Sequence, residues 1–533
     1  MIHFGYVLLL ILTLTLNFAA RAAEVIHADV CVYGGTSAGV IAAAAVAKEG
    51  RTVVLVEPGA HFGGMSSGGL GETDIGNKMV IGGMSRDFYR AVGKTYGQAE
   101  AWKFEPHVAE KVFNDLIAKF KLKTLLQHRL VQVEKEGAKI VRITLENTAK
   151  NNNAEKIQIE AAVFIDAGYE GDLMAQAKVK YHVGREATKD YDEPLDGIRA
   201  HTPSHQFGVH VDPYKKPGDA ESGLIPLIQP GDGGAPGDGD ARVQSYNFRL
   251  CLTQNEKIKI PLKAPENYDP QTYELFARFT EALVAAKKPV KSATFLKIDM
   301  MPNGKTDINN NGAVSTDFIG QSWKYPEAGY EERAQIWKAH EDYIKGLLYF
   351  MQTSPRLPET FRTEMQKWGL CSDEFTDTGC WPHQLYVREA RRMTGRYVVT
   401  QADCVHKTVI ADSVGMAAYN MDSHNCQRFV KSGSAINEGD VQVAPSGPYP
   451  VGYGAITPKA EECTNLIVPV CLSATHIAYG SIRMEPVFMV LGESAALAAC
   501  QAIIEKKSVQ EIDVPRLQKR LLEAGQVLEF KKK

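Results

Sequence analysis

The sequence predicts an α/β fold built around a parallel β-sheet, with one domain assembled from both ends of the chain. Three stretches support this prediction. Residues 28–57 have the pattern of strand, glycine turn, helix, strand and acid, residues 63–71 hold a second run of glycines, and residues 465–505 return to a strand and a long apolar helix. Strands that alternate with helices in this way form parallel sheets, because each crossover helix returns the chain to the same edge.

The first stretch has the features of a dinucleotide site. The apolar strand Val30–Tyr33 is followed by three glycines within residues 34–39, an Ala-rich helix and a second strand that ends at Glu57. The free N–H groups at a helix N-terminus attract a pyrophosphate, and an acid at the tip of the second strand accepts hydrogen bonds from a ribose. Thr36 stands where the G-x-G-x-x-G fingerprint has its middle glycine. Either the loop is altered there or the threonine hydroxyl reaches a phosphate; the alternative to a nucleotide site is an ordinary glycine turn.

The second glycine run begins directly after that acid. Residues 58–71 are Pro-Gly-Ala-His-Phe-Gly-Gly-Met-Ser-Ser-Gly-Gly-Leu-Gly. So many glycines form neither a helix nor a stable strand, but they allow the backbone to pass close to a flat or charged group. A second run in this place suits a flavin better than a nicotinamide cofactor, so we predict FAD. The alternative for these residues is a mobile surface loop.

Two later stretches complete the predicted FAD-binding domain. Val163–Gly168 has the pattern of a strand that ends in small residues, and the C-terminal ends of such strands point into the ligand crevice. Asn465–Val470 is a further strand, and Pro486 then stands at the start of an apolar helix, where a proline costs no hydrogen bond. We expect the N-terminus of that helix to face the flavin. The predicted FAD-binding residues are Gly34, Gly35, Thr36, Ser37, Ala38, Gly39, Glu57, Pro58, Gly63, Gly64, Met65, Ser66, Ala167, Gly168, Met484, Glu485, Pro486 and Val487.

Composition divides the chain into a leader, a discontinuous FAD-binding domain and an insert. The Rossmann-like FAD-binding domain, a parallel sheet with a β-meander, is predicted from residues 24–190 and 456–510, and residues 511–533 form a C-terminal tail. Residues 191–455 form an inserted α+β substrate domain, which starts with a segment rich in Pro, Gly and Asp and has no second dinucleotide fingerprint. In the insert we predict helices at residues 273–286, 330–350 and 385–400, a strand at 245–252 and an irregular segment at 299–323.

The first 22 residues resemble a secretory signal peptide. Tyr6–Ala20 is almost entirely apolar, and Ala20-Arg21-Ala22 fits a small-x-small cleavage signal. We expect a periplasmic or secreted protein that acquires its cofactor after transport, since no twin arginine precedes the apolar run. The alternative is an uncleaved leader, which would then be the one contact with a membrane. The net charge of −3 gives no reason to expect a nucleic-acid partner.

Nine cysteines remain after cleavage of the leader. Cys31 and Cys500 fall in predicted core elements, where a cysteine acts as a small apolar residue. No C-x-x-C motif occurs, so neither a redox pair nor a zinc ribbon is supported, and no metal site is predicted. In an oxidising compartment the candidates for disulfide pairing are Cys371 with Cys380, Cys404 with Cys426, and Cys463 with Cys471.

Seven runs of residues match a known family. They are residues 33–39, 57–59, 63–71, 164–175, 385–393, 419–424 and 478–487. In these runs the chain resembles the exported bacterial FAD-dependent oxidoreductases of the broad FAD-oxidored group, some of whose members carry a xanthan lyase label. The resemblance covers nearly all of residues 28–505 and implies the fold and the cofactor, and a threonine at position 36 is usual in that group. It supplies no substrate. The lyase label has no support in the residues, because a lyase would not need a dinucleotide fold.

A flavin oxidoreductase needs few protein groups for its chemistry. The cofactor accepts the hydride, while the protein positions the substrate and takes up its proton. Oxidation of an alcohol or sugar needs a base, most often a histidine, and a carboxylate substrate needs an arginine fork. His424 and His476 are the candidate bases, and Arg391 is the candidate anchor. Arg388 and Arg392 would lie one turn apart on the same face of the predicted helix. The alternatives are structural histidines, and arginines that join the domains through salt bridges.

Other patterns offer further hypotheses. His61 lies between the ribose acid and the second glycine run, a region where some flavoproteins attach FAD covalently to a histidine. Asp307–Gly312 fits the first half of a calcium loop, but Phe318 stands at the twelfth position, which should be Glu. Asn and Gly also make ordinary turns. Tyr246 and Arg249 lie near each other on the predicted strand of the insert.

The sequence therefore predicts an exported FAD-dependent oxidoreductase that transfers a hydride from a small polar organic molecule to the flavin. A carbohydrate or a sugar acid is the preferred substrate class, by analogy with the family and from the expected export. The electron acceptor, oxygen or a carrier, is left open. Two other classes are retained, a carbohydrate-processing lyase that binds FAD structurally and a non-catalytic binding protein with a relic nucleotide fold. Bleaching of the flavin by substrate under anaerobic conditions separates the three.

Overall fold

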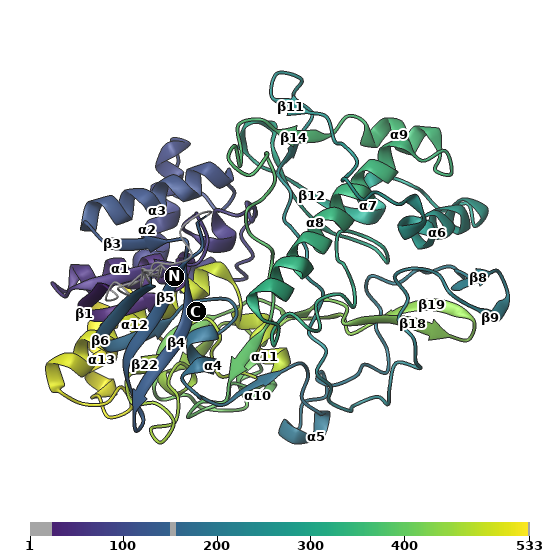
Figure 1. The fold of residues 1–533 in the computed structure, drawn as a ribbon. Coiled ribbons are helices and arrows are strands. Elements are labelled where there is room, and N and C mark those ends of the chain that lie inside the picture. The colour runs from purple at the N-terminus through teal and green to yellow at the C-terminus, as the bar shows by residue number, and fades with distance from the viewer. Residues whose placement is uncertain (1–23, 150–155, 531–533) are drawn as a thin grey trace, which may run out of the picture.

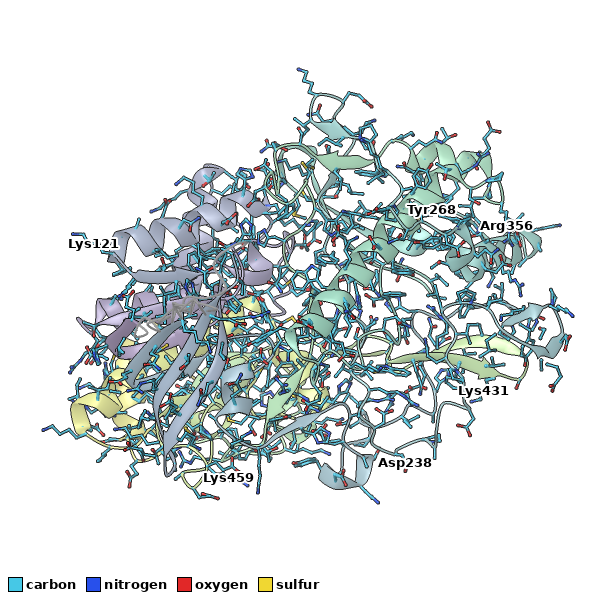
Figure 2. The ribbon with its side chains drawn as sticks, in the orientation of Figure 1. Lys121, Asp238, Tyr268, Arg356, Lys431 and Lys459 are labelled. Atoms are coloured by element: carbon cyan, nitrogen blue, oxygen red, sulfur yellow. The ribbon has the colours of Figure 1, made fainter. Side chains whose placement is uncertain are left out.

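The chain folds into an FAD-binding part made from its two ends and a second part made from its middle. A computed structural model describes residues 24–149 and 156–530, so the predicted leader lies outside the described residues. In Figure 1 the two ends of the chain, in purple and yellow, lie together on one side of the molecule. The middle of the chain, in teal and green, forms the other side. In Figure 2, drawn in the same orientation, side chains from both parts extend into the region between them.

The largest sheet confirms the predicted α/β fold class. Its strands lie in the order β3-β2-β1-β6-β5-β4, and β22 pairs with β6. β1, β2, β3, β6 and β22 are parallel where they pair, whereas β4 and β5 form an antiparallel meander. The register of β22 sets Leu466 beside Phe164, so residues near the end of the chain extend the sheet that the N-terminal residues begin. The bounds are β1 Glu24–Tyr33, β2 Val53–Glu57, β3 Lys123–Leu126, β4 His128–Glu136, β5 Lys139–Asn147, β6 Lys156–Asp166 and β22 Leu466–Ile467.

Two buried apolar helices, α1 (Ser37–Lys48) and α12 (Glu485–Glu505), pack against each other in this domain. Gly492 permits the close approach, because a Cβ atom there would lie 2.4 Å from the carbonyl oxygen of Ala38. By length and composition α12 could cross a membrane, but 89% of its most apolar window is buried inside the protein, as in a core helix. The other helices of this part are α2 Gly83–Thr95, α3 Pro106–Phe120, α4 Asp172–Gln176, α11 His476–Ile482 and α13 Val514–Glu523.

The insert consists of helices and of sheets with two or three short strands. Aromatic rings join its helices: the centre of the Phe295 ring lies 4.5 Å from that of Phe276 in a tilted arrangement and 5.5 Å from that of Phe361 in an edge-to-face arrangement. The predicted helices at 273–286 and 330–350 are confirmed by α6 and α8. The helices are α5 Thr188–Tyr191, α6 Glu274–Ala285, α7 Ser292–Phe295, α8 Tyr330–Thr353, α9 Glu359–Met365 and α10 Gln401–Cys404. The strands are β7 Tyr181–Val183, β8 Tyr214–Lys216, β9 Asp219–Leu224, β10 Leu252–Thr253, β11 Lys259–Ile260, β12 Leu296–Met300, β13 Thr306–Asn310, β14 Gly369–Cys371, β15 Arg391–Met393, β16 Ser413–Ala417, β17 Met421–Ser423, β18 Gln427–Lys431, β19 Ser434–Glu438, β20 Val441–Val443 and β21 Tyr449–Gly452.

The predicted helix at residues 385–400 is wrong. The segment is extended, and its strand β15 pairs antiparallel with β7. Every residue from Leu385 to Met393 is buried, including three arginines and a glutamate. In a helix Arg388 and Arg392 would lie one turn apart on the same face, whereas in an extended chain four residues span roughly 13 Å and the successive Arg391 and Arg392 point to opposite sides. The arginines therefore reach different acidic partners and do not share a helical face.

Two further predictions in the insert are corrected. The strand expected at residues 245–252 forms isolated bridges, from Asn247 to Tyr386 and from Leu250 to Ile308, and becomes a regular strand only at β10. The segment at 299–323, expected to be irregular, contains most of the hairpin β12–β13. The first deviation arises because residues 247 and 250 pair with segments far away in the sequence, whereas β12 and β13 form a local hairpin despite the polar composition of residues 299–323.

Candidate active site

The first glycine turn forms a cradle that only glycine can build. Gly34 has a φ of +101°, and a Cβ atom on it would lie 2.5 Å from the backbone nitrogen of Gly168. A Cβ atom on Gly35 would lie 2.8 Å from Cβ of Glu57. The ends of β1, β2 and β6 therefore meet at backbone distance, at the C-terminal edge where open α/β sheets bind ligands.

Thr36 has a structural role that explains the missing middle glycine. Its side chain caps α1 by accepting a hydrogen bond from the backbone N–H of Gly39 at 3.2 Å. Its hydroxyl also donates to the carbonyl oxygen of Ala167 at 2.8 Å. A threonine is a good N-cap, so this residue ties the start of α1 to the end of β6.

Glu57 is held in place at the tip of β2 by backbone donors. Its Oε2 accepts from the N–H of Gly35 and its Oε1 from the N–H of Gly59, both at 2.6 Å. Burial raises the pKa of Glu57 to about 7, although these two N–H groups lower it. Each carboxylate oxygen has a second lone pair, so the carboxylate can still accept hydrogen bonds from a ribose.

A cavity of about 530 Å³ opens beside this cradle. Its volume falls within the range of roughly 300–1,000 Å³ that is usual for small-molecule sites. Six of the predicted FAD-binding residues line it, together with Gly59: Gly34, Thr36, Glu57, Pro58, Gly64 and Gly168. The glycine cradle, the helix N-terminus and the acid at the strand tip fit the adenosine and phosphate groups of FAD.

The second glycine run reaches the start of α12 through a buried acid. Glu485, the first residue of α12, accepts hydrogen bonds from the hydroxyls of Ser37, Tyr169 (2.7 Å) and Ser66 (3.4 Å). Tyr169 in turn accepts from the N–H of Met65 at 2.9 Å. Burial raises the pKa of Glu485 to about 7, against the three hydroxyls that lower it. The start of α12, from Met484 to Val487, is therefore joined to both glycine runs, as its predicted place beside the flavin requires.

The second glycine run also touches the insert directly. A Cβ atom on Gly69, whose φ is +122°, would lie 2.2 Å from the carbonyl oxygen of Arg249, and one on Gly68 would lie 2.4 Å from Cβ of Gln384. The N–H of Glu72 donates to Asp307 at 2.9 Å. The segments of the insert next to the flavin side are thus those that carry Arg249, Gln384 and Asp307.

His424, a predicted base, lies between two aspartates. Its Nδ1 is 2.7 Å from Oδ2 of Asp317, and its Nε2 is 3.6 Å from Oδ2 of Asp422. Burial and the nearby Arg388 lower the pKa of His424, but the two aspartates outweigh them and hold that pKa above its usual value of 6.5. This arrangement orients the ring and favours its protonated form.

His476, the other predicted base, belongs to the same hydrogen-bond network. Its Nδ1 is 2.7 Å from Glu389 and its Nε2 is 2.9 Å from the hydroxyl of Ser423. Gln244 links the two histidines, because it donates to Glu389 at 2.9 Å and accepts from the N–H of His424 at 3.2 Å. With both ring nitrogens engaged and the side chain buried, His476 has the surroundings of a structural histidine.

The predicted arginines lie in two different places. Arg388 forms an ion pair of 3.0 Å with Asp317, the aspartate that also holds His424. Arg391 instead pairs with Asp172 at 2.8 Å and with Glu327 at 2.9 Å. Asp172 is the first residue of α4 in the FAD-binding part. The geometry of Arg391 is therefore that of a bridge between the two parts of the molecule, and its role as a substrate anchor stays a prediction.

Tyr386 is the centre of a buried cluster that the sequence alone does not identify. The guanidinium groups of Arg388, Arg483 and Arg249 lie 4.7, 5.7 and 6.0 Å from the centre of its ring. Arg483 also donates to the hydroxyl of Tyr386 at 2.9 Å and pairs with Asp422 at 2.8 Å. The one sequence signal is that Tyr386 and Arg483 fall in runs shared with the family, at 385–393 and 478–487.

The calcium hypothesis is contradicted by the partner of Asp307. This residue lies on β13, and both of its carboxylate oxygens bind Arg249, each at 2.7 Å. The carboxylate that would be the first calcium ligand is thus already bound to a guanidinium.

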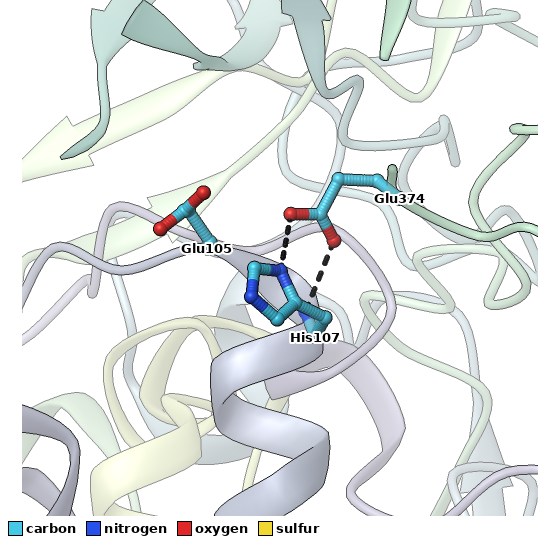
Figure 3. A group of neighbouring side chains, drawn as sticks. All are labelled: Glu105, His107 and Glu374. Atoms are coloured by element: carbon cyan, nitrogen blue, oxygen red, sulfur yellow. Dashed lines mark hydrogen bonds and ion pairs between the residues drawn. The ribbon is translucent and has the colours of Figure 1, made fainter. Parts of the chain in front are cut away.

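One other cluster of potential metal ligands occurs among the described residues, at Glu105, His107 and Glu374 (Figure 3). His107 Nδ1 is 2.6 Å from Glu374. The ammonium group of Lys305, however, lies 2.8 Å from Glu105 and 2.6 Å from Glu374. Lys305 therefore supplies the positive charge that these carboxylates need. The absence of a bound metal stays a prediction, which metal analysis of the purified protein tests.

Two other expectations are also revised. All nine cysteines are free, and Cys371 faces Cys251, at 3.7 Å between sulfur atoms, rather than Cys380. The other two expected pairs are likewise not formed. His61 has Nδ1 at 2.8 Å from Glu110 and Nε2 at 3.1 Å from Asp377, so carboxylates engage both nitrogens through which a flavin could be attached.

Comparison with known proteins gives the family. No curated protein matches the sequence significantly. Three solved structures match in part. OxyS anhydrotetracycline hydroxylase from Streptomyces rimosus has 9% identity, covers 34% of this chain and 41% of that chain, and has a TM-score of 0.24. L-proline dehydrogenase from P. horikoshii has 18% identity, coverages of 32% and 26% and a TM-score of 0.19, and p-nitrophenol 4-monooxygenase PnpA from Pseudomonas putida DLL-E4 has 11% identity, coverages of 31% and 46% and a TM-score of 0.23. The chain spans less than half the length of each, and TM-scores this low carry no conclusion. By contrast, residues 29–521 match the model of the family described as FAD dependent oxidoreductase. The chain therefore belongs to that family of FAD-dependent oxidoreductases.

Proposed function

We propose that the protein oxidises a small uncharged molecule with several hydroxyl groups, a carbohydrate, by hydride transfer to FAD. The observation that carries the proposal is the network around His424 and Tyr386. It lies in the segments of the insert that touch the second glycine run, through Arg249 and Gln384. It also includes Arg483, two residues before the start of α12.

Bound FAD supplies the acceptor for the hydride. The protein must then remove the hydroxyl proton of the substrate, and His424 is the group suited to that task. Asp317 orients its ring through Nδ1, while Nε2 is turned toward Asp422 at 3.6 Å, a distance too long for a strong hydrogen bond. Because the aspartates raise its pKa, His424 must first lose its own proton before it can accept one from the substrate.

The charge balance of the network supports a neutral substrate over a sugar acid. Arg249 uses its fork on Asp307, Arg388 pairs with Asp317, and Arg483 pairs with Asp422. A substrate carboxylate would have to compete with these aspartates and would lose its hydration on entry. Hydroxyl groups, in contrast, can donate to aspartates and accept from arginines without adding charge, and the ring of Tyr386 offers an apolar contact.

An anaerobic flavin-reduction panel tests the proposal. Neutral monosaccharides are compared with the matching aldonic and uronic acids, and loss of flavin absorbance is recorded for each. Bleaching by one or more neutral sugars, with weaker or no bleaching by the matched acids, is the expected result. Bleaching by the acids alone contradicts the argument from charge balance. Cleavage of an oligosaccharide while the flavin stays oxidised would instead favour a lyase that binds FAD structurally.

We also propose that the protein is exported to the periplasm or the medium, and that its substrate and its electron acceptor are found there. The support is the leader pattern in residues 1–22. N-terminal sequencing of the mature protein from the native host tests this: a start after residue 22 is expected, and an intact Met1 in the cytoplasm contradicts it.

A further inference from the structure

One wall of the nucleotide cavity comes from the insert. The cavity that Gly34, Glu57 and Gly168 line is also lined by α8, the longest helix of the insert. The α8 residues that line it are Tyr330, Arg333, Ala334, Trp337 and Lys338. Their spacing of three, four, seven and eight residues from Tyr330 places all five on one face of the helix.

The start of α8 is fixed on the FAD-binding domain. Arg333 forms an ion pair of 2.7 Å with Asp172 of α4, and the hydroxyl of Tyr330 donates to the carbonyl oxygen of Leu130 in β4 at 2.9 Å. The guanidinium of Arg129 lies 4.5 Å from the centre of the Tyr330 ring. Figure 1 shows α8 extending from the insert toward the FAD-binding domain. This helix is therefore part of the cavity wall and not a distant cap.

The helix lies at the ribose end of the cavity. Glu57, the ribose acid, is paired in the sheet with Leu126 of β3, and the chain then continues into β4, where Tyr330 binds Leu130. From Tyr330 to Trp337 the helix rises about 10 Å. Trp337 is partly exposed, so its ring has a surface open to the cavity.

We propose that this face of α8 binds the adenosine half of FAD, with Trp337 as the main contact. A flat aromatic base packs well on an indole ring. The insert would then hold the cofactor as well as the substrate, so that FAD joins the two parts of the molecule. The proposal concerns cofactor affinity and does not depend on which substrate is oxidised.

FAD release from the holoenzyme tests the proposal. The protein is diluted in steps with and without ADP, which carries the adenosine half alone, and free FAD is measured by its fluorescence. Trp337→Ala should raise the Kd for FAD about ten- to a hundredfold, the range expected for loss of one base–aromatic stack, and should weaken the competition by ADP. Trp337→Phe keeps an aromatic face and should stay within a few-fold. Gln335→Ala, on another face of α8, is the matched control and should change nothing.

The experiment contains no substrate, so its result does not depend on whether the proposed function is correct. Equal Kd values for Trp337→Ala and Gln335→Ala would overturn the proposal. If Trp337→Ala does not fold, tryptophan emission gives a second measurement. FAD release should raise the emission of the wild type more than that of Trp337→Phe, and an equal rise in both would also overturn the proposal.

Discussion

The FAD-binding side and the proposed substrate side of the candidate active site are shaped by different kinds of contact. On the FAD side, backbone meets backbone at glycines, as where Gly34 approaches Gly168. On the proposed substrate side, buried ion pairs join distant segments, such as Arg249 with Asp307 and Arg388 with Asp317. A shape made by the absence of side chains tolerates no added atom. A shape made by paired charges tolerates changes of size, but not the loss of one partner.

The FAD side should therefore fail completely when one methyl group is added. Gly34→Ala combines a positive φ with a Cβ atom 2.5 Å from a backbone nitrogen, so we expect protein without bound flavin. Flavin absorbance per mole of purified protein measures this. Gly50→Ala is the control, because Gly50 also has a positive φ, of +74°, but a Cβ atom there meets nothing within 4 Å. If both variants retain FAD, close backbone approach is not what shapes the cradle.

The next largest effect should come from His424. Its replacement by Gln should slow the reductive half-reaction about 10²- to 10⁴-fold, the usual contribution of a general base. In the wild type the rate should rise with pH through a pKa above 6.5, because the neutral ring accepts the proton and the aspartates favour the charged one. Stopped-flow flavin reduction across pH measures both. His476→Gln should retain the pH dependence; if it is this variant that loses it, His476 is the base.

Each buried ion pair of the proposed substrate side should contribute more to the free energy of unfolding than an exposed ion pair does. Asp317→Asn removes the partner of both Arg388 and His424 and leaves a buried guanidinium without its counter-charge. We expect a loss of about 3–5 kcal/mol in the free energy of unfolding, measured by urea denaturation. Asp115→Asn, which breaks an exposed pair with Lys111, should cost less than 1 kcal/mol. Similar losses in the two variants would mean that burial adds little.

The same contrast explains which parts could be predicted from sequence. The parallel sheet, the glycine cradle and the helices α6 and α8 follow from local patterns, so they were accessible without a structure. Residues 385–393 were not, because their Arg-, Glu- and Ala-rich composition favours a helix while distant partners decide the conformation. Arg388, Arg391 and Arg392 bind Asp317, Asp172 and Glu186, each from a different segment. The cluster around Tyr386 was missed for this reason: its members come together only through such long-range pairs.

The smallest effect is expected at Thr36, which lies in the glycine cradle but acts through its side-chain hydrogen bonds. Its hydroxyl caps α1 and binds the carbonyl oxygen of Ala167, so Thr36→Gly should lower the free energy of unfolding by about 1 kcal/mol through the lost cap and hydrogen bond. The Kd for FAD should change by less than about threefold, since the glycine of the common fingerprint is restored. Urea denaturation and FAD release measure the two quantities, and Thr36→Ser, which keeps the hydroxyl, should behave as the wild type. Unchanged stability with a tenfold weaker hold on FAD would mean that the hydroxyl binds a phosphate of the cofactor instead of the helix.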